Sequence, residues 1–143
     1  MRSSTGQVPV GARPAGIARK PGRAALGPRD VGRAGEDLAA AWYEARGYEV
    51  LARNWRCREG ELDLIARRGG LVVFCEVKAR SSAAFGLPAE AVGPLKQARL
   101  RRLAALWFAD SSRSSSGRAS GGRARFDVVS VLAGQVEVIE AAF

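Results

Sequence analysis

The sequence contains no histidine at any of its 143 positions. Catalysis by Ser-His-Asp or Cys-His groups, acid–base chemistry by imidazole and zinc sites with histidine ligands are therefore excluded. A hydrolase made from this chain must work with carboxylates, lysine and a hard metal ion instead.

Cysteine and long apolar runs are also scarce. Cys57 and Cys75 lack the spacing of a disulfide framework or a metal site, and Cys75 lies in an apolar stretch that predicts a buried thiol. No run approaches the roughly 20 apolar residues of a membrane helix, and the basic N-terminus lacks the hydrophobic segment of a signal peptide. The sequence therefore predicts a cytoplasmic protein without a membrane partner.

Acidic residues are in the minority, 14 against 23 basic ones, and the formal net charge is +9. The excess lies mainly in residues 1–30, which carry +5, and in residues 111–125, which carry +4. Such an excess favours a polyanionic partner through counterion release. The alternative is a bias in composition, because 20 of the 23 basic residues are arginine.

Composition also divides the chain. Residues 1–29 are rich in Gly, Pro, Ser, Arg and Ala without apolar periodicity, which predicts a flexible basic tail. Residues 30–143 are long enough for a single domain with its own core. Within that domain, residues 111–122 form a low-complexity stretch that predicts a mobile loop.

Two helices are expected in this domain. The first should run from Asp30, a suitable N-cap, to a stop at Gly47, and the second from Pro94 to near Asp110. Their apolar positions at helical spacing are Ala34, Leu38, Ala41, Trp42 and Ala45 in the first helix, and Leu100, Leu103, Ala104 and Trp107 in the second.

Five strands are expected beside these helices. Residues 48–56, 61–67 and 71–80 have strand patterns separated by short turns and predict a meander. Residues 125–132 and 135–141 predict a closing pair of strands. The order αβββαββ indicates an α/β domain with a mixed β-sheet flanked by helices.

The hairpin between the second and third strands brings charged residues together. If its turn is centred on residues 69–70, paired positions sum to 139, so Asp63 lies opposite Glu76 and Glu61 opposite Lys78. Because strand side chains alternate, all four project from one face.

Facing carboxylates repel each other, so this pairing needs an offsetting charge. A bound Mg²⁺ supplies it, and Lys78 could orient an attacking water or stabilise charge on a phosphate. Lys78 is one of only three lysines in a chain that otherwise uses arginine, which favours a specific role. The alternative is that these charges form the solvated face of a half-exposed strand.

Four segments carry a resemblance to a known family: GRAGEDLAAAWYEARGYEVLARNWR, GELDLIARRGG, LVVFCEVKAR and RFDVVSV. Over about residues 31–132 the chain resembles the YraN-like family of uncharacterised bacterial proteins. That family is similar to restriction endonucleases and archaeal Holliday junction resolvases, whose site is an Asp followed on the next strand by Glu-x-Lys. Here those positions are Asp63 and Glu76-Val77-Lys78.

The resemblance implies a restriction endonuclease-like core and a Mg²⁺-dependent nuclease, in which Mn²⁺ could replace Mg²⁺. Asp63, Glu76 and the Val77 carbonyl would bind the metal, Lys78 would assist the attacking water, and the product would carry a 5′-phosphate. The resemblance also implies a homodimer and a further site glutamate, Glu36. A helical wheel places Glu36 away from the predicted stripe, so a solvated position is the alternative.

Basic residues outside this constellation are candidates for contacts to nucleic acid. Arg53 and Arg56 flank Trp55, and Lys96 and Arg99 share a face of the second helix. A solvated strand or helix face explains each pair as well.

Arg125 and Asp127 match the family's late motif, with a structural ion pair as the alternative to a role in the site.

Two classes of function therefore stay open. One is a nuclease acting on DNA, more than on RNA, in repair or recombination, with branched DNA among its candidate substrates. The other is a non-catalytic nucleic-acid-binding module of the same fold that serves as a repair or recombination partner. A basic accessory protein bound to RNA is a third option, which the arginine-rich tail alone would permit.

Overall fold

The computed structural model describes residues 27–80, 92–113 and 122–143. The chain divides into two units, Met1–Asp30 and Val31–Phe143, and the fold below is that of the second. Nearly all of the predicted tail, and most of the predicted loop at 111–122, lie outside the described residues. No helix in the described parts is both long enough and apolar enough to cross a membrane.

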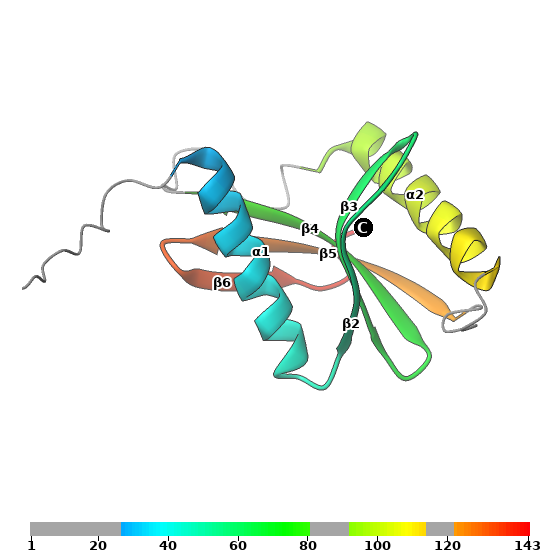
Figure 1. The fold of residues 1–143 in the computed structure, drawn as a ribbon, viewed down its shortest axis with the longest axis horizontal. Coiled ribbons are helices and arrows are strands. Elements are labelled where there is room, and N and C mark those ends of the chain that lie inside the picture. The colour runs from blue at the N-terminus through cyan, green and yellow to red at the C-terminus, as the bar shows by residue number, and fades with distance from the viewer. Residues whose placement is uncertain (1–26, 81–91, 114–121) are drawn as a thin grey trace, which may run out of the picture. The chain divides into compact units, whose positions relative to one another are not determined.

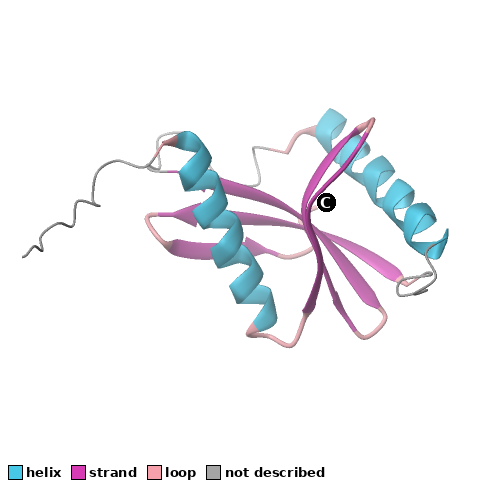
Figure 2. Ribbon diagram, in the orientation of Figure 1, coloured by secondary structure: helices cyan, strands magenta, loops and turns pink. Residues whose placement is uncertain are grey.

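The described elements combine two helices with one five-stranded sheet (Figures 1 and 2). The sheet order is β2-β3-β4-β5-β6, antiparallel throughout except for the parallel pair β4 and β5. The predicted mixed α/β class is therefore confirmed. The elements are α1 (Pro28–Glu44), β2 (Glu49–Cys57), β3 (Gly60–Arg68), β4 (Leu71–Arg80), α2 (Pro94–Arg113), β5 (Arg123–Leu132) and β6 (Gln135–Ile139).

Helix α2 has the buried face that its sequence predicts. Leu100, Leu103, Ala104 and Trp107 are all buried, and they pack against Phe74 and other apolar side chains on one face of the sheet. The Phe74 and Trp107 rings meet edge to face, with centroids 5.7 Å apart. The large apolar residues at helical spacing are thus buried against the sheet, as their pattern predicts.

Helix α1 uses a different face from the predicted one. Its buried residues are Gly35, Ala39, Ala40 and Tyr43, whereas Leu38 from the predicted stripe is 37% exposed. The predicted stripe is wrong because small residues let the helix approach the sheet closely. A Cβ atom added to Gly35 would lie 2.5 Å from the Cβ of Ala79 on β4.

The ends of α1 also differ slightly from expectation. The helix begins at Pro28 and not at Asp30, which lies inside the first turn. It ends at Glu44, and the turn that follows closes at the predicted stop, Gly47, whose φ of +85° suits glycine. The Tyr48 amide donates to the Tyr43 carbonyl across this stop, which is a common way to end a helix.

The β3–β4 hairpin has the predicted register along the part that pairs. Arg68 faces Leu71, and the ladder keeps the same sum to Leu64 and Cys75, where it ends. The β2–β3 ladder continues farther, to Cys57 and Gly60. The distal half of the β2–β3 hairpin therefore leaves β4 and bends towards α2 (Figure 1).

Candidate active site

Glu76 is the first buried charge beyond the end of the β3–β4 ladder. Its residue is only 7% exposed, and its Oε2 atom accepts contacts from two lysines. Lys78 Nζ, on the same strand, lies 3.2 Å away, and Lys96 Nζ, on the first turn of α2, lies 2.7 Å away. Two of the three lysines in the chain therefore converge on one carboxylate oxygen.

Asp63 lies on β3, one residue beyond the last ladder pair. Its Oδ2 atom accepts a hydrogen bond from the Val77 amide at 2.9 Å. A side-chain oxygen thus replaces the backbone carbonyl that would accept this bond in a continued ladder. Burial, followed by the charge of Glu76, raises the pKa of Asp63 to about 6, and the Val77 amide partly offsets this rise. Burial and the nearby charge of Glu76 thus both oppose ionisation of Asp63.

Glu36 lies nearer to this pair than the helical wheel indicated. Because α1 buries Gly35, the next residue lies at the edge of the contact with the sheet. The Glu36 charge contributes to the raised pKa of Asp63, and its Oε1 atom accepts a hydrogen bond from Asn54 Nδ2 at 3.1 Å. Asn54 has a φ of +53° within β2, a conformation that costs energy for a non-glycine residue.

Glu61 takes a different partner from the expected one. It was expected opposite Lys78, but its Oε2 atom forms an ion pair with Arg56 Nε at 3.1 Å. The hairpin half that contains Glu61 has left β4, so Lys78 forms its ion pair with Glu76 on its own strand. The constellation therefore consists of Asp63, Glu76 and Lys78, with Lys96 added.

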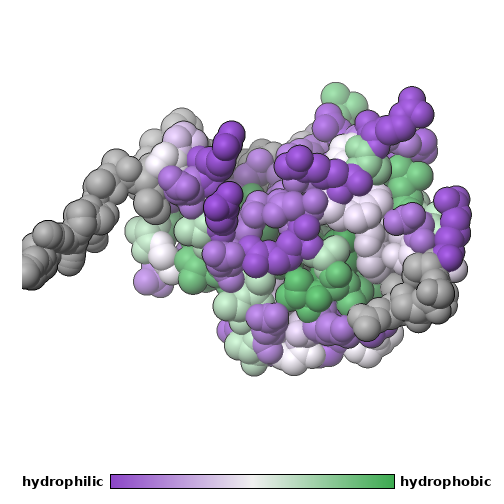
Figure 3. Space-filling view, in the orientation of Figure 1, coloured by the Kyte–Doolittle hydropathy of each residue, from purple (hydrophilic) through white to green (hydrophobic). Residues whose placement is uncertain are grey.

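The predicted nucleic-acid contacts have varied surroundings. Arg53 pairs with Asp37 of α1 at 2.5 Å, while Arg99 is exposed and forms no ion pair with another described residue. The bonds from Arg53 and Asn54 tie β2 to α1, where hydrophilic side chains gather between the helix and the hairpin (Figure 3). Contacts of these arginines to nucleic acid stay a prediction.

Lys96 is the residue whose place the sequence prediction missed. It was expected on a DNA-facing helix surface, yet its ammonium lies against Glu76. The signal that singled out Lys78, a lysine kept in an arginine-rich chain, applied equally to Lys96.

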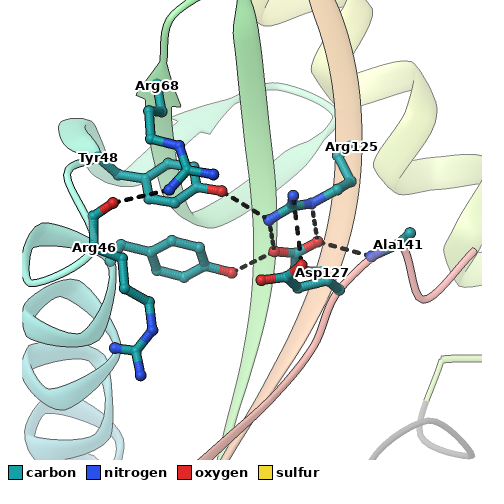
Figure 4. Close-up of polar contacts among 8 residues, drawn as sticks. Arg46, Tyr48, Arg68, Arg125, Asp127 and Ala141 are labelled. Carbon is teal, nitrogen blue, oxygen red and sulfur yellow. Dashed lines mark hydrogen bonds and ion pairs between the residues drawn. The ribbon is translucent and has the colours of Figure 1, made fainter.

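Asp127 is a second buried carboxylate, and it is completely enclosed. It has no exposed surface, and Arg125 donates to both of its oxygens at 2.9 and 2.8 Å (Figure 4). The Tyr43 hydroxyl and the Ala141 amide complete the shell at 2.6 and 3.0 Å. Arg125 also donates to the Tyr48 hydroxyl at 3.2 Å (Figure 4).

These contacts make Arg125 and Asp127 a structural ion pair, which was the alternative left open for them. Burial, together with nearby Cys75 and Asp127, raises the pKa of Tyr43 far above its ordinary value, so its hydroxyl stays a donor. Burial likewise raises the pKa of the Cys75 thiol and keeps it neutral. The two tyrosines of this network were not predicted as polar partners.

The oxygen donors at the candidate site suit a hard divalent ion. Within residues 27–80, 92–113 and 122–143, no three carboxylates or thiols come together as a complete protein cage for a metal. Mg²⁺ does not require one, since it commonly binds through one or two carboxylates and keeps water or phosphate oxygens elsewhere. Asp63 and Glu76 fit that donor set, and a cation there would relieve their repulsion.

Comparisons with known proteins place this chain among bacterial relatives. The model of the family described as Uncharacterised protein family UPF0102 matches residues 35–131. A UPF0102 protein of Beutenbergia cavernae is 56% identical over 102 residues, covering 71% of this chain and 81% of the relative. One of Frankia casuarinae is 54% identical over 101 residues, with 71% and 80% covered, and one of Rhodococcus opacus is 47% identical over 118 residues, with 79% and 95% covered.

Proposed function

This chain belongs to the uncharacterised protein family UPF0102, the YraN-like family that its motifs resemble, and from that membership and its site we propose that it is a Mg²⁺-dependent nuclease. The proposed reaction is hydrolysis of phosphodiester bonds in DNA, of the repair or recombination type. The carrying observation is the convergence of Asp63, Glu76 and Lys78 where β3 leaves β4.

The course of the chain supports a restriction endonuclease-like core. A three-stranded meander ends at β4, α2 follows, and β5 returns parallel to β4. Two separate apolar clusters, one containing residues of α1 and the other residues of α2, cover the sheet. The proposed site lies within β4, at the point where the β3–β4 ladder ends while the parallel β4–β5 ladder continues to Arg80.

The roles of the residues follow from their chemistry. Asp63 and Glu76 would hold the ion, with the Val77 carbonyl as a further oxygen donor. The bound ion would supply Lewis-acid stabilisation of phosphate charge. Lys78, whose side chain is 29% exposed, would orient the attacking water from the solvent side. Glu36, coupled electrostatically to Asp63, would adjust the charge of the site from α1.

A cleavage assay tests this proposal. Branched, duplex and single-stranded DNA and RNA are incubated with wild type, Asp63→Asn and Lys78→Ala, in Mg²⁺ or Mn²⁺. We expect wild type to leave 5′-phosphate ends, and each substitution to lower the rate by about 100-fold or more. Arg113→Gln, which removes an exposed charge from the last turn of α2, is the matched control. The proposed nuclease activity is refuted if no substrate is cleaved, or if cleavage survives both site substitutions.

One observation favours a second candidate, a binding module without turnover. Glu76 is already neutralised by Lys78 and Lys96, so the fold does not depend on a metal to tolerate that carboxylate. Under this alternative, wild type and Asp63→Asn bind DNA equally well and neither cleaves it. Measured affinities for the same substrates, at one fixed salt concentration, distinguish the two candidates.

A further inference from the structure

Lys96 occupies an unfavourable place for a cation. It lies in the first turn of α2, where the helix dipole is positive, and that turn contains no acidic residue. The nearest compensation is Glu76 on β4, whose Oε2 atom lies 2.7 Å from the ammonium. The carboxylate thus acts both as partner of Lys96 and as an anion at the start of α2.

The two lysines on Glu76 differ in how they are attached. Lys78 is two residues away on the same strand, at 3.2 Å, with 29% of its side chain exposed. Lys96 reaches over from another element and is more exposed, at 38%. Of the two, Lys96 can leave Glu76 by a change of rotamer that brings its charge to the surface.

We propose that Lys96 is a positioning residue that holds Glu76 until a divalent ion takes its place, and that the released ammonium then contacts a phosphate of bound nucleic acid. This inference rests on the proposed function for the ion and the polyanion. A divalent ion at Glu76 would repel both ammonium groups, and Lys96, with the more exposed side chain, is the one that moves away. The freed Lys96 and the positive end of α2 together favour an anion.

Binding of metal and of nucleic acid is then coupled through one side chain. Each ligand favours the state in which Lys96 has left Glu76, so each strengthens the binding of the other. With metal alone, Lys96 competes for the carboxylate and weakens metal binding.

A titration with Mn²⁺, followed by the electron paramagnetic resonance signal of the free ion, tests this coupling without cleavage. Without DNA, we expect Lys96→Gln to tighten Mn²⁺ binding about fivefold relative to wild type, because the competing cation is gone. A short duplex with phosphorothioate linkages, which resist hydrolysis, should tighten Mn²⁺ binding several-fold in wild type. That increment should largely disappear in Lys96→Gln.

Arg113→Gln is the matched control, since it removes one exposed charge from the last turn of the same helix, at the opposite end from Lys96. It should change Mn²⁺ binding by less than twofold. Lys96→Met, which keeps the aliphatic stem, replaces Lys96→Gln if the latter does not fold. The inference is wrong if both neutral variants bind Mn²⁺ like Arg113→Gln, or more weakly than wild type.

The outcome for the nuclease is separate. If the coupling depends on Lys96 but wild type cleaves no substrate, the inference about Lys96 is supported and the proposed nuclease activity is refuted. Cleavage by wild type, with identical titrations for Lys96→Gln and Arg113→Gln, would support the nuclease and overturn the inference about Lys96.

Discussion

Asp127 and Glu76 are buried carboxylates on adjacent strands, and they have opposite kinds of surroundings. In the parallel ladder Cys75 faces Asp127 and Glu76 faces Val128, so the two acids are one position apart. Asp127 has no exposed surface and receives donors from a tyrosine, an arginine and a backbone amide. Glu76 has two lysines on one oxygen and a second carboxylate, Asp63, as a charged neighbour.

The difference separates a carboxylate enclosed by hydrogen bonds from a pair of carboxylates that lie close to each other. Around Asp127, hydrogen bonds reach both oxygens and hold the group in one arrangement, which is how a buried charge is tolerated. Around Glu76 and Asp63, like charges remain close, and the lysines that offset them reach solvent. A carboxyl group whose pKa is raised by burial and a nearby charge, as at Asp63, marks a candidate site for binding or chemistry. The first region holds the fold together, and the second is available for chemistry.

The same substitution at the two sites should have opposite effects on stability. Asp127→Asn removes the charge to which Arg125 and the Tyr43 hydroxyl donate, and leaves the partly buried guanidinium of Arg125 without its nearest carboxylate. We expect the free energy of unfolding to fall by about 3 kcal/mol. Urea denaturation at neutral pH, followed by tryptophan fluorescence, measures it.

Two other variants complete this comparison. Asp63→Asn should keep or raise the stability under the same conditions, since it removes a repelled charge. Glu137→Gln changes an exposed acid on β6 and should stay within about 0.5 kcal/mol of wild type. Equal losses in Asp127→Asn and Asp63→Asn would show that the two regions do not differ in kind.

The two helices show what the sequence could and could not predict about the fold. The apolar face of α2 was predicted because Leu100, Leu103 and Trp107 are large, and large apolar residues at helical spacing are buried together. The face of α1 was not predicted, because its contact is made by glycine and alanine, and a larger residue, Leu38, points outward. The spacing of large apolar residues predicts which face of a helix is buried. A helix that lies close to a sheet can instead require small residues on its buried face.

The site was predicted in part for a similar reason. Turn position and alternation sufficed for Asp63, Glu76 and Lys78, because all three lie on one hairpin. Lys96 and Glu36 come from the two helices, and their proximity depends on tertiary packing that no local pattern encodes. The sequence pattern also did not indicate that β3 leaves β4, so Glu61 was assigned the wrong partner.

Gly35 allows one helix to serve both regions, since α1 supplies Tyr43 to Asp127 and Glu36 to the surroundings of Asp63. Gly35→Ala places a methyl group 2.5 Å from the Cβ of Ala79. The strain should outweigh the gain in helix propensity, with a net loss of about 1 to 2 kcal/mol in unfolding free energy. Denaturation curves of the variant and wild type measure the loss.

A double-mutant cycle tests the cause. Ala79→Gly removes the opposing methyl group. The loss of unfolding free energy in the double variant, Gly35→Ala with Ala79→Gly, should therefore be about 1 kcal/mol smaller than the sum of the two single losses. Additive losses would mean that α1 adjusts to the alanine elsewhere, and that the close approach is not what positions the helix.

The smallest expected effect is the pH dependence that Asp63 contributes. Its pKa is about 6 in the folded protein, against an ordinary value of 3.8 when exposed to water. Between these values the folded state binds the proton more tightly than the unfolded state does, so stability falls as pH rises. The penalty is absent below about pH 4 and complete above about pH 6. Allowing for partial exposure, it should amount to about 1 kcal/mol.

Asp63→Asn isolates this contribution, because asparagine has no proton to bind in that range. The difference in unfolding free energy between Asp63→Asn and wild type should be small near pH 4 and should grow to about 1 kcal/mol in favour of the variant near pH 7. The other ionisable groups are common to both proteins and cancel in the difference. Saturating Mg²⁺ should suppress the growth by relieving the repulsion in wild type. If this difference in unfolding free energy does not change with pH, the surroundings of Asp63 do not raise its pKa. The contrast between the Asp127 region and the Asp63 region would then fail at the residue on which the proposed chemistry depends.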